Sequence, residues 1–231
     1  MVITTKESLE FRIKTFNPEL IIEVTSACNR ACVGCYAPNV VTNKTASELY
    51  SEAPDLFLSI SNLNRAFGEM SYFPGLTSMR GGEPSLHPEL STLLLITARH
   101  SEQVILETHA RWLLPENLNN YQELINAIFS LNIIVKISFD KMHNLKSEDL
   151  QLITNFLEMR KIEYRIAITE DTMTNFLITR NQCIWVEDSR IIYQPKATNA
   201  SELIVPAVGV INTSGRFIES VTSKLTFGEA L

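Results

Sequence analysis

Short apolar runs alternate along this chain with longer segments in which apolar residues recur at helical spacing. Six runs rich in Ile, Leu and Val predict strands: Leu20–Val24, Leu76–Met79, Val104–Leu106, Ile133–Ile137, Tyr164–Ile168 and Cys183–Val186. Most of them lack strict polar–apolar alternation, which is typical of parallel strands that are buried on both faces. Five segments between them predict helices: Thr45–Phe67, His87–His100, Glu116–Leu131, Ser147–Lys161 and Thr172–Asn181.

Helix start signals support this division. Thr45 is followed three residues later by Glu48, which is the pattern of a capping box, and Pro88 and Ser147 stand where two further helices are expected to begin. Regular strand–helix alternation predicts an α/β fold with a parallel sheet. About 200 residues hold the repeats, fewer than the roughly 250 of a closed eight-unit barrel. A partial (βα)6 TIM-like barrel or a doubly wound open sheet therefore remains.

The pattern changes from Asn199 onward. The stretch "ELIVPAVGVINTSGRFIESV" predicts two strands joined by the turn Asn212–Gly215. We therefore expect a main domain over residues 1–198 and a short C-terminal hairpin-like extension over residues 199–231.

Composition excludes several classes of function. The net charge is −6 and the pI is about 5.3, and the Lys and Arg residues form no basic block, so we expect no nucleic-acid partner. Apolar runs such as Leu93–Ile96 are far too short to cross a bilayer, and the first residues lack the apolar region of a secretory signal. Four unevenly spaced cysteines do not form a disulfide framework. A cytoplasmic location, with reduced thiols, is the expectation.

Three of the four cysteines lie in one loop, Thr25–Pro38, directly after the first predicted strand. Such a loop emerges at the carboxyl end of the sheet, where α/β folds bind ligands. With this spacing, the thiolates of Cys28, Cys32 and Cys35 can reach the same small metal centre. Structural zinc needs four ligands, and a cubane iron–sulfur cluster is usually held by four cysteines. Three cysteines would leave one iron open to a substrate or cofactor.

Two less specific interpretations of the three thiols remain open. A zinc site could be completed by Cys183 or by a histidine, or the thiols could be unrelated to a metal. Cys183 itself lies in the apolar run "CIWVED" and is expected to be a small buried hydrophobic residue.

The pattern Cys28-x-x-x-Cys32-x-x-Cys35-Tyr36 resembles the signature of the radical S-adenosylmethionine (radical SAM) enzymes. The resemblance implies a 4Fe–4S cluster held by the three cysteines, with the amino and carboxylate groups of SAM on the open iron and Tyr36 near the adenine. It also implies reductive cleavage of SAM to a 5′-deoxyadenosyl radical, which then abstracts hydrogen from a substrate.

Two later segments extend the resemblance. Gly81-Gly82-Glu83-Pro84, after the second predicted strand, is similar to the family's GGEP motif, whose backbone and acid hold the SAM ammonium. Taken alone, this stretch would also suit a plain strand-to-helix turn. The segment "KISFDKMHN" resembles the one that contacts the ribose and carboxylate of SAM, which implies such roles for Ser138 and Asp140.

Other positions depart from the family pattern. Thr108-His109-Ala110 stands where the family often has Thr-Asn-Gly, so the role of His109 is open, as are those of Lys136 and His143. The tail is similar to the core of the SPASM or Twitch extensions of peptide-modifying members. No cysteine follows Cys183, so this resemblance implies either a shrunken extension without metal or only a hairpin that closes the sheet.

The sequence thus predicts a radical SAM oxidoreductase that acts on a peptide or a small biosynthetic substrate. Its implied partners are that substrate and a reductant such as flavodoxin or ferredoxin, with no membrane. One alternative is an activase that installs a glycyl radical on a partner protein. Another is a non-enzymatic zinc or iron–sulfur module that uses the three cysteines and Cys183. The substrate, the fate of SAM and the oligomeric state stay open.

The cysteine count predicts the metal content. Because the tail has no thiolate, anaerobically reconstituted protein should carry ~4 iron and ~4 sulfide per chain, which is one cubane cluster. Cys183→Ser should change neither number. Loss of the cluster in that variant, measured by iron and sulfide analysis, would instead make the three-cysteine loop part of a closed four-thiolate site.

Overall fold

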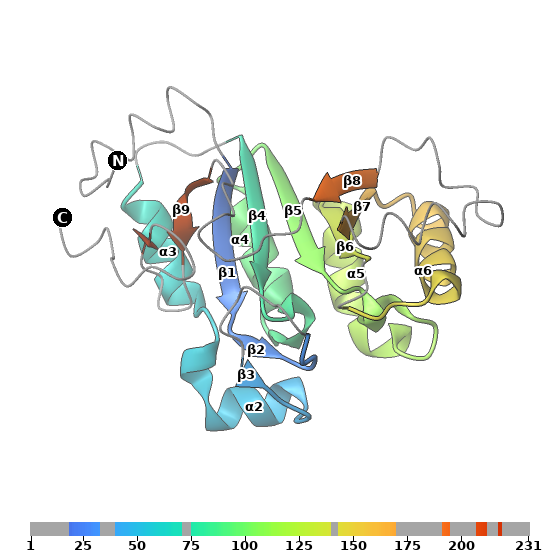
Figure 1. Ribbon diagram of the computed structural model, residues 1–231. Helices are drawn as coiled ribbons and strands as arrows, with labels where there is room; N and C mark the ends of the chain where they lie inside the picture. Colours follow the sequence, from blue (N-terminus) through green and yellow to red (C-terminus); the bar gives the residue numbers. More distant parts are fainter. Residues whose placement is uncertain are drawn as a thin grey trace.

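The computed structural model describes residues 19–32, 40–70, 75–139, 143–169, 191–194, 207–211 and 217–218 (Figure 1). Its strands are β1 (Glu19–Thr25), β2 (Ala27–Cys28), β3 (Val40–Val41), β4 (Leu76–Gly81), β5 (Gln103–Thr108), β6 (Ile134–Ser138), β7 (Tyr164–Thr169), β8 (Ile191–Gln194), β9 (Ala207–Ile211) and β10 (Phe217–Ile218). Its α-helices are α2 (Ala46–Glu52), α3 (Ile60–Gly68), α4 (Leu90–Ala98), α5 (Gln122–Ser130) and α6 (Ser147–Met159). Four short 3-10 helices are η1 (Pro54–Leu56), η2 (Pro84–Leu86), η3 (Arg111–Leu113) and η4 (Leu118–Tyr121).

Eight of these strands form one sheet, in the order β10-β9-β1-β4-β5-β6-β7-β8. Its neighbours are parallel except β9 and β10, which are antiparallel. The central strands β1, β4, β5, β6 and β7 confirm five of the six predicted strands, and the sixth, Cys183–Val186, lies outside the described residues. Within the described residues the sheet is open, with β8 and β10 at its edges. The parallel α/β architecture is confirmed, and it is consistent with a partial barrel.

The predicted tail strands pair as expected, since Phe217 and Ile218 of β10 lie opposite Ile211 and Val210 of β9. The predicted turn between them is outside the described residues. β9 also pairs in parallel with β1, so this hairpin extends the main sheet at the edge of the first strand.

The helix predicted over Thr45–Phe67 is wrong as a single element, because the chain forms two helices there, α2 and α3. The capping box of Thr45 and Glu48 is confirmed at the start of α2. Pro54 ends the helical path because it lacks an N–H and clashes with the preceding turn. The chain then runs extended beside β1, where the Leu58 amide donates to the Val24 carbonyl at 2.9 Å. Thr172–Asn181, another predicted helix, lies outside the described residues.

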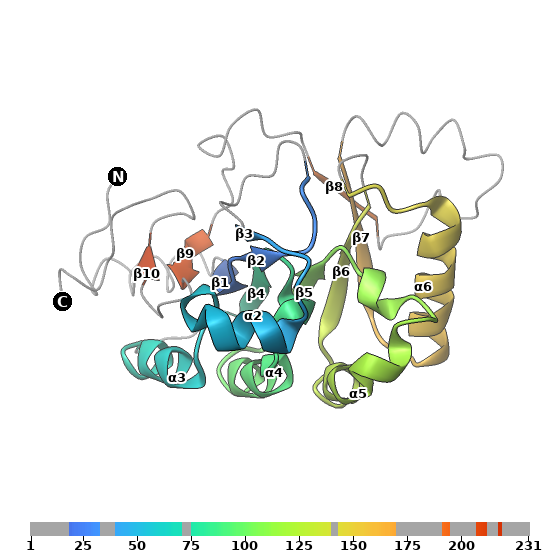
Figure 2. The same cartoon turned by 90° about the horizontal axis from the view of Figure 1, so that it is seen from below.

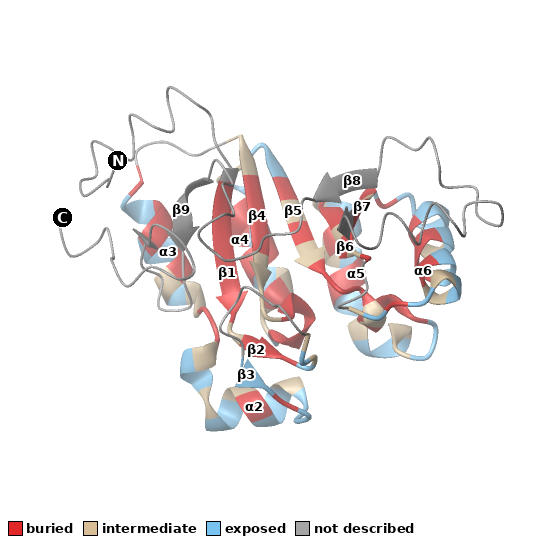
Figure 3. Ribbon diagram, viewed as in Figure 1, coloured by how far each residue is buried: buried red, intermediate tan, exposed pale blue. Residues whose placement is uncertain are grey.

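Helices α3, α4, α5 and α6 lie on the outside of the curved sheet (Figure 2). The strand residues that face them form the main apolar core, in which Leu20, Met79, Leu106 and Ile137 are fully buried. Figure 3 shows this burial along β1 and β4. Every second residue faces the opposite way, and we call that side, turned away from these four helices, the inner face. Among the described residues, no helix is long and apolar enough to cross a membrane.

A smaller layer lies at the carboxyl ends of the strands, where β2, β3 and α2 gather (Figure 1). Ala27, Leu49, Phe57 and Leu86 form a separate apolar cluster there. The buried His87 ring packs edge-on against Phe57, and its Nε2 bonds to the Leu58 carbonyl at 2.9 Å. This layer supports the loops that leave β1 and β4.

Candidate functional site

The loops that carry the predicted cofactor residues meet at the carboxyl edge of the sheet. Cys28 lies in β2 and is buried, and Cys32 follows it and is partly exposed. Cys35 and Tyr36 are outside the described residues. The part of the loop that the structure describes thus contains two of the three predicted ligands. Within the described ranges, no group of three His, Cys, Asp or Glu side chains gathers as a metal site.

Backbone hydrogen bonds join the cysteine loop to the glycine loop. The Gly82 amide donates to the Thr25 carbonyl at 2.7 Å, and the Glu83 amide donates to the Ala27 carbonyl at 2.8 Å. On the other side, the Thr42 amide donates to the Cys28 carbonyl at 2.9 Å. Cys28 therefore occupies a segment that is held from two sides.

Both glycines are required by this close approach. Gly81 has φ of +154°, and a Cβ there would lie 2.2 Å from the Thr25 carbonyl oxygen. A Cβ on Gly82 would lie 2.0 Å from the Ala27 oxygen and 3.1 Å from the Cβ of Cys28. Such contacts are far inside van der Waals distance, so side chains at these positions would push the two loops apart.

Glu83 is almost fully buried, at 1% exposed, and its carboxylate gathers donors from two loops. Oε1 accepts from the Ser85 amide at 3.1 Å and from the Thr108 hydroxyl at 2.7 Å. Oε2 accepts from the His109 amide at 3.1 Å and lies 3.3 Å from the Nε2 of that residue. A buried carboxylate needs such donors to offset its lost hydration. Glu83 thus fixes the loop after β5, and its role toward an ammonium stays a prediction.

His109 connects the same carboxylate to the cysteine loop, a contact that sequence reasoning missed. Its Nδ1 accepts from the Arg111 amide at 3.2 Å, so the ring proton is assigned to Nε2. That N–H points at Asn29 Oδ1, at 2.9 Å, with Glu83 close by. Asn29 follows Cys28 directly, so His109 holds the chain between the first two cysteines. The departure from Thr-Asn-Gly at this position was the only signal in the sequence.

The His109 ring is kept neutral by its surroundings. Burial lowers the pKa of His109 below its usual range, and the opposing attraction of the Glu83 carboxylate does not reverse this. The positive charges of Arg111 and Arg30, and His143, lower the pKa further. A neutral ring suits the assigned tautomer, which needs one acceptor and one donor nitrogen.

The remaining predicted residues lie near the end of β6. Ser138 is its last residue, is partly exposed and pairs in register with Ala167 of β7. Asp140 is outside the described residues. The next described residue, His143, accepts a hydrogen bond on its carbonyl oxygen from Arg30 Nη2 at 3.2 Å. Arg30 lies between Cys28 and Cys32, so this bond connects the cysteine loop to the loop after β6.

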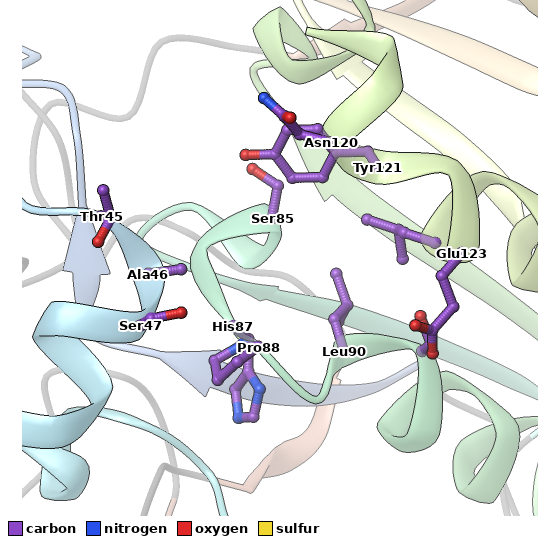
Figure 4. A pocket seen from close by; sticks show the side chains of 12 residues that line it. Thr45, Ala46, Ser47, Ser85, His87, Pro88, Leu90, Asn120, Tyr121 and Glu123 are labelled. Carbon is purple, nitrogen blue, oxygen red and sulfur yellow. The ribbon is translucent and has the colours of Figure 1, made fainter.

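A pocket of about 500 Å³ lies elsewhere, between the start of α2, the η2 region and the η4–α5 segment (Figure 4). Thr45, Ser47, Ser85, His87 and Tyr121 are among the residues that line it. None of the predicted cofactor residues contributes to its wall. We therefore assign the candidate site to the joined loops rather than to this pocket.

No protein-family model matches the chain, and no curated protein does. Solved structures do match. A histidine-tagged form of anSMEcpe with bound AdoMet has a TM-score of 0.52 at 15% identity, and the match covers 79% of this chain and 52% of that protein. Native anSMEcpe with bound AdoMet has a TM-score of 0.50 at 16% identity, with 77% and 52% covered. SuiB of Streptococcus suis bound to S-adenosylmethionine matches at a TM-score of 0.33 and 14% identity, with 81% and 53% covered, too low a score to indicate a shared fold by itself.

The chain spans about half the length of each of these solved structures. At such low identity, the two anSMEcpe matches show a shared fold and nothing finer. The parallel α/β architecture described above is therefore one that also occurs in a protein with bound AdoMet.

The Gly82 contact can be tested with a matched pair of glycines. Gly82→Ala should lower the free energy of unfolding by about 2 kcal/mol or more, because its Cβ collides with backbone rather than with a flexible side chain. Gly68→Ala, at the end of α3 with nothing near its Cβ position, should change it by less than about 1 kcal/mol. Denaturant unfolding measures both, and equal effects would contradict the required contact.

His109 also predicts a pH dependence of stability. Its pKa is lowered in the folded chain, so the unfolded chain binds the proton more tightly, and stability is lost as pH falls below about 6.5. His109→Gln removes this proton site and should flatten the fall in the free energy of unfolding between about pH 7 and pH 5. Parallel pH profiles for the variant and the natural sequence would show that His109 is not the titrating group.

Proposed function

We propose that this chain is a radical SAM enzyme whose cofactor site is formed by the joined loops after β1 and β4. The observation that carries the proposal is the pair of backbone hydrogen bonds from Gly82 and Glu83 to Thr25 and Ala27. They hold a cysteine-rich loop and a Gly-Gly-Glu loop side by side at the carboxyl edge of a parallel sheet, where such folds bind ligands. Neither loop alone would be specific.

In this proposal Cys28, Cys32 and Cys35 hold a 4Fe–4S cluster. The donor set fits such a cluster, because three thiolates within eight residues can reach one object while an iron stays open. The described cysteines agree with this, since Cys28 and Cys32 lie on the same loop and Gly82 leaves the space beside Cys28 free of a side chain. When bound and reduced, such a cluster would supply the electron for reductive cleavage of SAM to a 5′-deoxyadenosyl radical.

The chain's own residues would bind and orient SAM. The backbone of Gly81 and Gly82 and the carboxylate of Glu83 would hold the ammonium. Ser138 and Asp140 would contact the ribose and carboxylate, and Tyr36 would bind near the adenine. Both anSMEcpe structures that share this fold contain AdoMet, which supports a site of this kind.

The substrate in this proposal is a peptide or a small biosynthetic molecule, and a flavodoxin or ferredoxin supplies electrons. A radical on an unactivated carbon must be kept from solvent, so the site needs a cover once substrate is bound. We infer that residues 199–231 form a C-terminal extension without metal ligands beside the main domain of residues 1–198. The reduced thiols that the cluster requires suit a cytoplasmic setting.

The test is SAM cleavage by anaerobically reconstituted and reduced protein. It should form 5′-deoxyadenosine and methionine, and Ala in place of any one of Cys28, Cys32 or Cys35 should abolish both products. Cys183→Ser is the matched cysteine control and should retain activity. Normal turnover by Cys32→Ala, or uptake of zinc and no iron by the protein, would contradict the radical SAM assignment and favour a structural metal module.

A further inference from the structure

A row of charged residues crosses the inner face of the sheet, one from each central strand. It consists of Glu23 on β1, Arg80 on β4, Glu107 on β5, Lys136 on β6 and Arg165 on β7. The strand register places Glu23 opposite Arg80, Glu107 opposite Lys136, and Lys136 opposite Arg165. The Arg80 guanidinium also attracts the Glu107 carboxylate, and this interaction links the members on β4 and β5. We call these five residues the charged row.

The Lys136 and Arg165 end of the charged row is partly exposed on the inner side. Its strand neighbours Met79, Leu106 and Val135 are fully buried against the outer helices. By contrast, the side chains of Lys136 and Arg165 are 14% and 30% exposed. Side chains alternate between the faces of a strand, so the row belongs wholly to the inner face.

Charges alternate in sign along the first part of the row. Burial alone would raise the pKa of Glu107, but the Lys136 ammonium, 3.3 Å away, and the Arg80 guanidinium outweigh it and hold the pKa below its usual range. Glu107 is therefore an anion held between two cations on neighbouring strands. For Glu23, burial prevails over the attraction of Arg80 and raises the pKa.

The alternation breaks at Lys136 and Arg165, where two cations lie directly opposite each other. Like charges in such a cross-strand pair are destabilising. Arg165 donates to the Tyr164 carbonyl at 3.1 Å and pairs with Glu163 at 2.5 Å. Glu163 is 52% exposed, and an ion pair at such a position contributes little in water. Arg165 can therefore exchange this partner for a better one.

We propose that a carboxylate of the substrate binds between Lys136 and Arg165. It would repeat there the arrangement that Glu107 has between Arg80 and Lys136, and so restore the alternation of charge. Lys and Arg carry three and five N–H donors, more than the ion pair of Lys136 with Glu107 and the contacts of Arg165 with Glu163 and the Tyr164 carbonyl use. A carboxylate accepts such donors in charge-assisted bonds.

This inference rests on the proposed function in that it describes the substrate. Lys136 lies two residues before Ser138, so at about 3.3 Å per residue the row is about 7 Å below the edge assigned to SAM. A carboxylate held at the row would place neighbouring carbon atoms of the substrate beneath that edge. The inference names an acidic group, on a peptide or a small molecule, as the feature that the enzyme recognises.

Direct binding of small probes tests the proposal on the full, cluster-reconstituted chain. N-acetyl-L-aspartate amide should bind about tenfold more tightly than N-acetyl-L-asparagine amide, its neutral match, in calorimetry or ligand-observed NMR. Arg165→Gln should remove most of this difference. Glu163→Gln should increase it, because the competing carboxylate is gone. Arg99→Gln is the control, because it removes the same charge from an exposed arginine at the end of α4. It should leave the difference in affinity between the two probes unchanged.

Three results would overturn the proposal. Equal binding of the two probes, or an Arg165→Gln variant that behaves like Arg99→Gln, would make the row a structural ladder of ion pairs. Tighter binding of inorganic phosphate than of the aspartate probe would assign the site to a phosphate instead. The proposed function is tested separately by SAM cleavage. Cleavage without probe discrimination refutes only the carboxylate site, and discrimination without cleavage refutes only the radical SAM assignment.

Discussion

The backbone contact between the ends of β1 and β4 is the constraint on which the candidate site depends. Two amides and two carbonyls meet there at hydrogen-bond distance, and neither glycine leaves room for a methyl group. From this contact follow the position of Cys28, the burial of Glu83 and, through that carboxylate, the path of the loop after β5. From that loop, His109 forms a hydrogen bond with Asn29, so the network of contacts also includes the cysteine loop.

The two faces of the sheet contribute differently to stability and to function. The outer face of β1 and of β4 to β7 is largely apolar and packs against α3 to α6, so its burial supplies the main hydrophobic stabilisation. The inner face offsets part of that gain, because Glu23 is a buried ionisable group and Glu107 is only 17% exposed. Such a face stabilises less than an apolar one would. Its residues therefore point to ligand recognition rather than to packing.

Much of the fold could be predicted from local patterns. Apolar runs located β1, β4, β5, β6 and β7, and Thr45 with Glu48 located the start of α2. The break between α2 and α3 was missed although Pro54 signalled it, because apolar periodicity continued across the proline. β8 was not expected, since "IIYQ" was too short a run to stand out among its neighbours.

Long-range contacts were beyond such patterns. The pairing of His109 with Asn29 joins residues 80 positions apart, and no local signal can reveal a partner at that distance. Likewise, the charged row is visible only once the strand register is known, because its members are isolated charges on five separate strands. Cys28, Gly82 and Glu83 were found because their motif is compact, whereas the geometry that makes Gly82 necessary was not.

The contact of Gly82 with Ala27 also limits how this region can change in length. One residue inserted or deleted between Val24 and Cys28 would shift the carbonyls that receive the Gly82 and Glu83 amides, and the misfit would pass into the register of β1 against β4. Variation in length is therefore not expected between Val24 and Cys28. For protein engineering, the transplantable unit is not the cysteine loop alone. It is the pair of segments Val24–Cys28 and Arg80–Glu83, moved together.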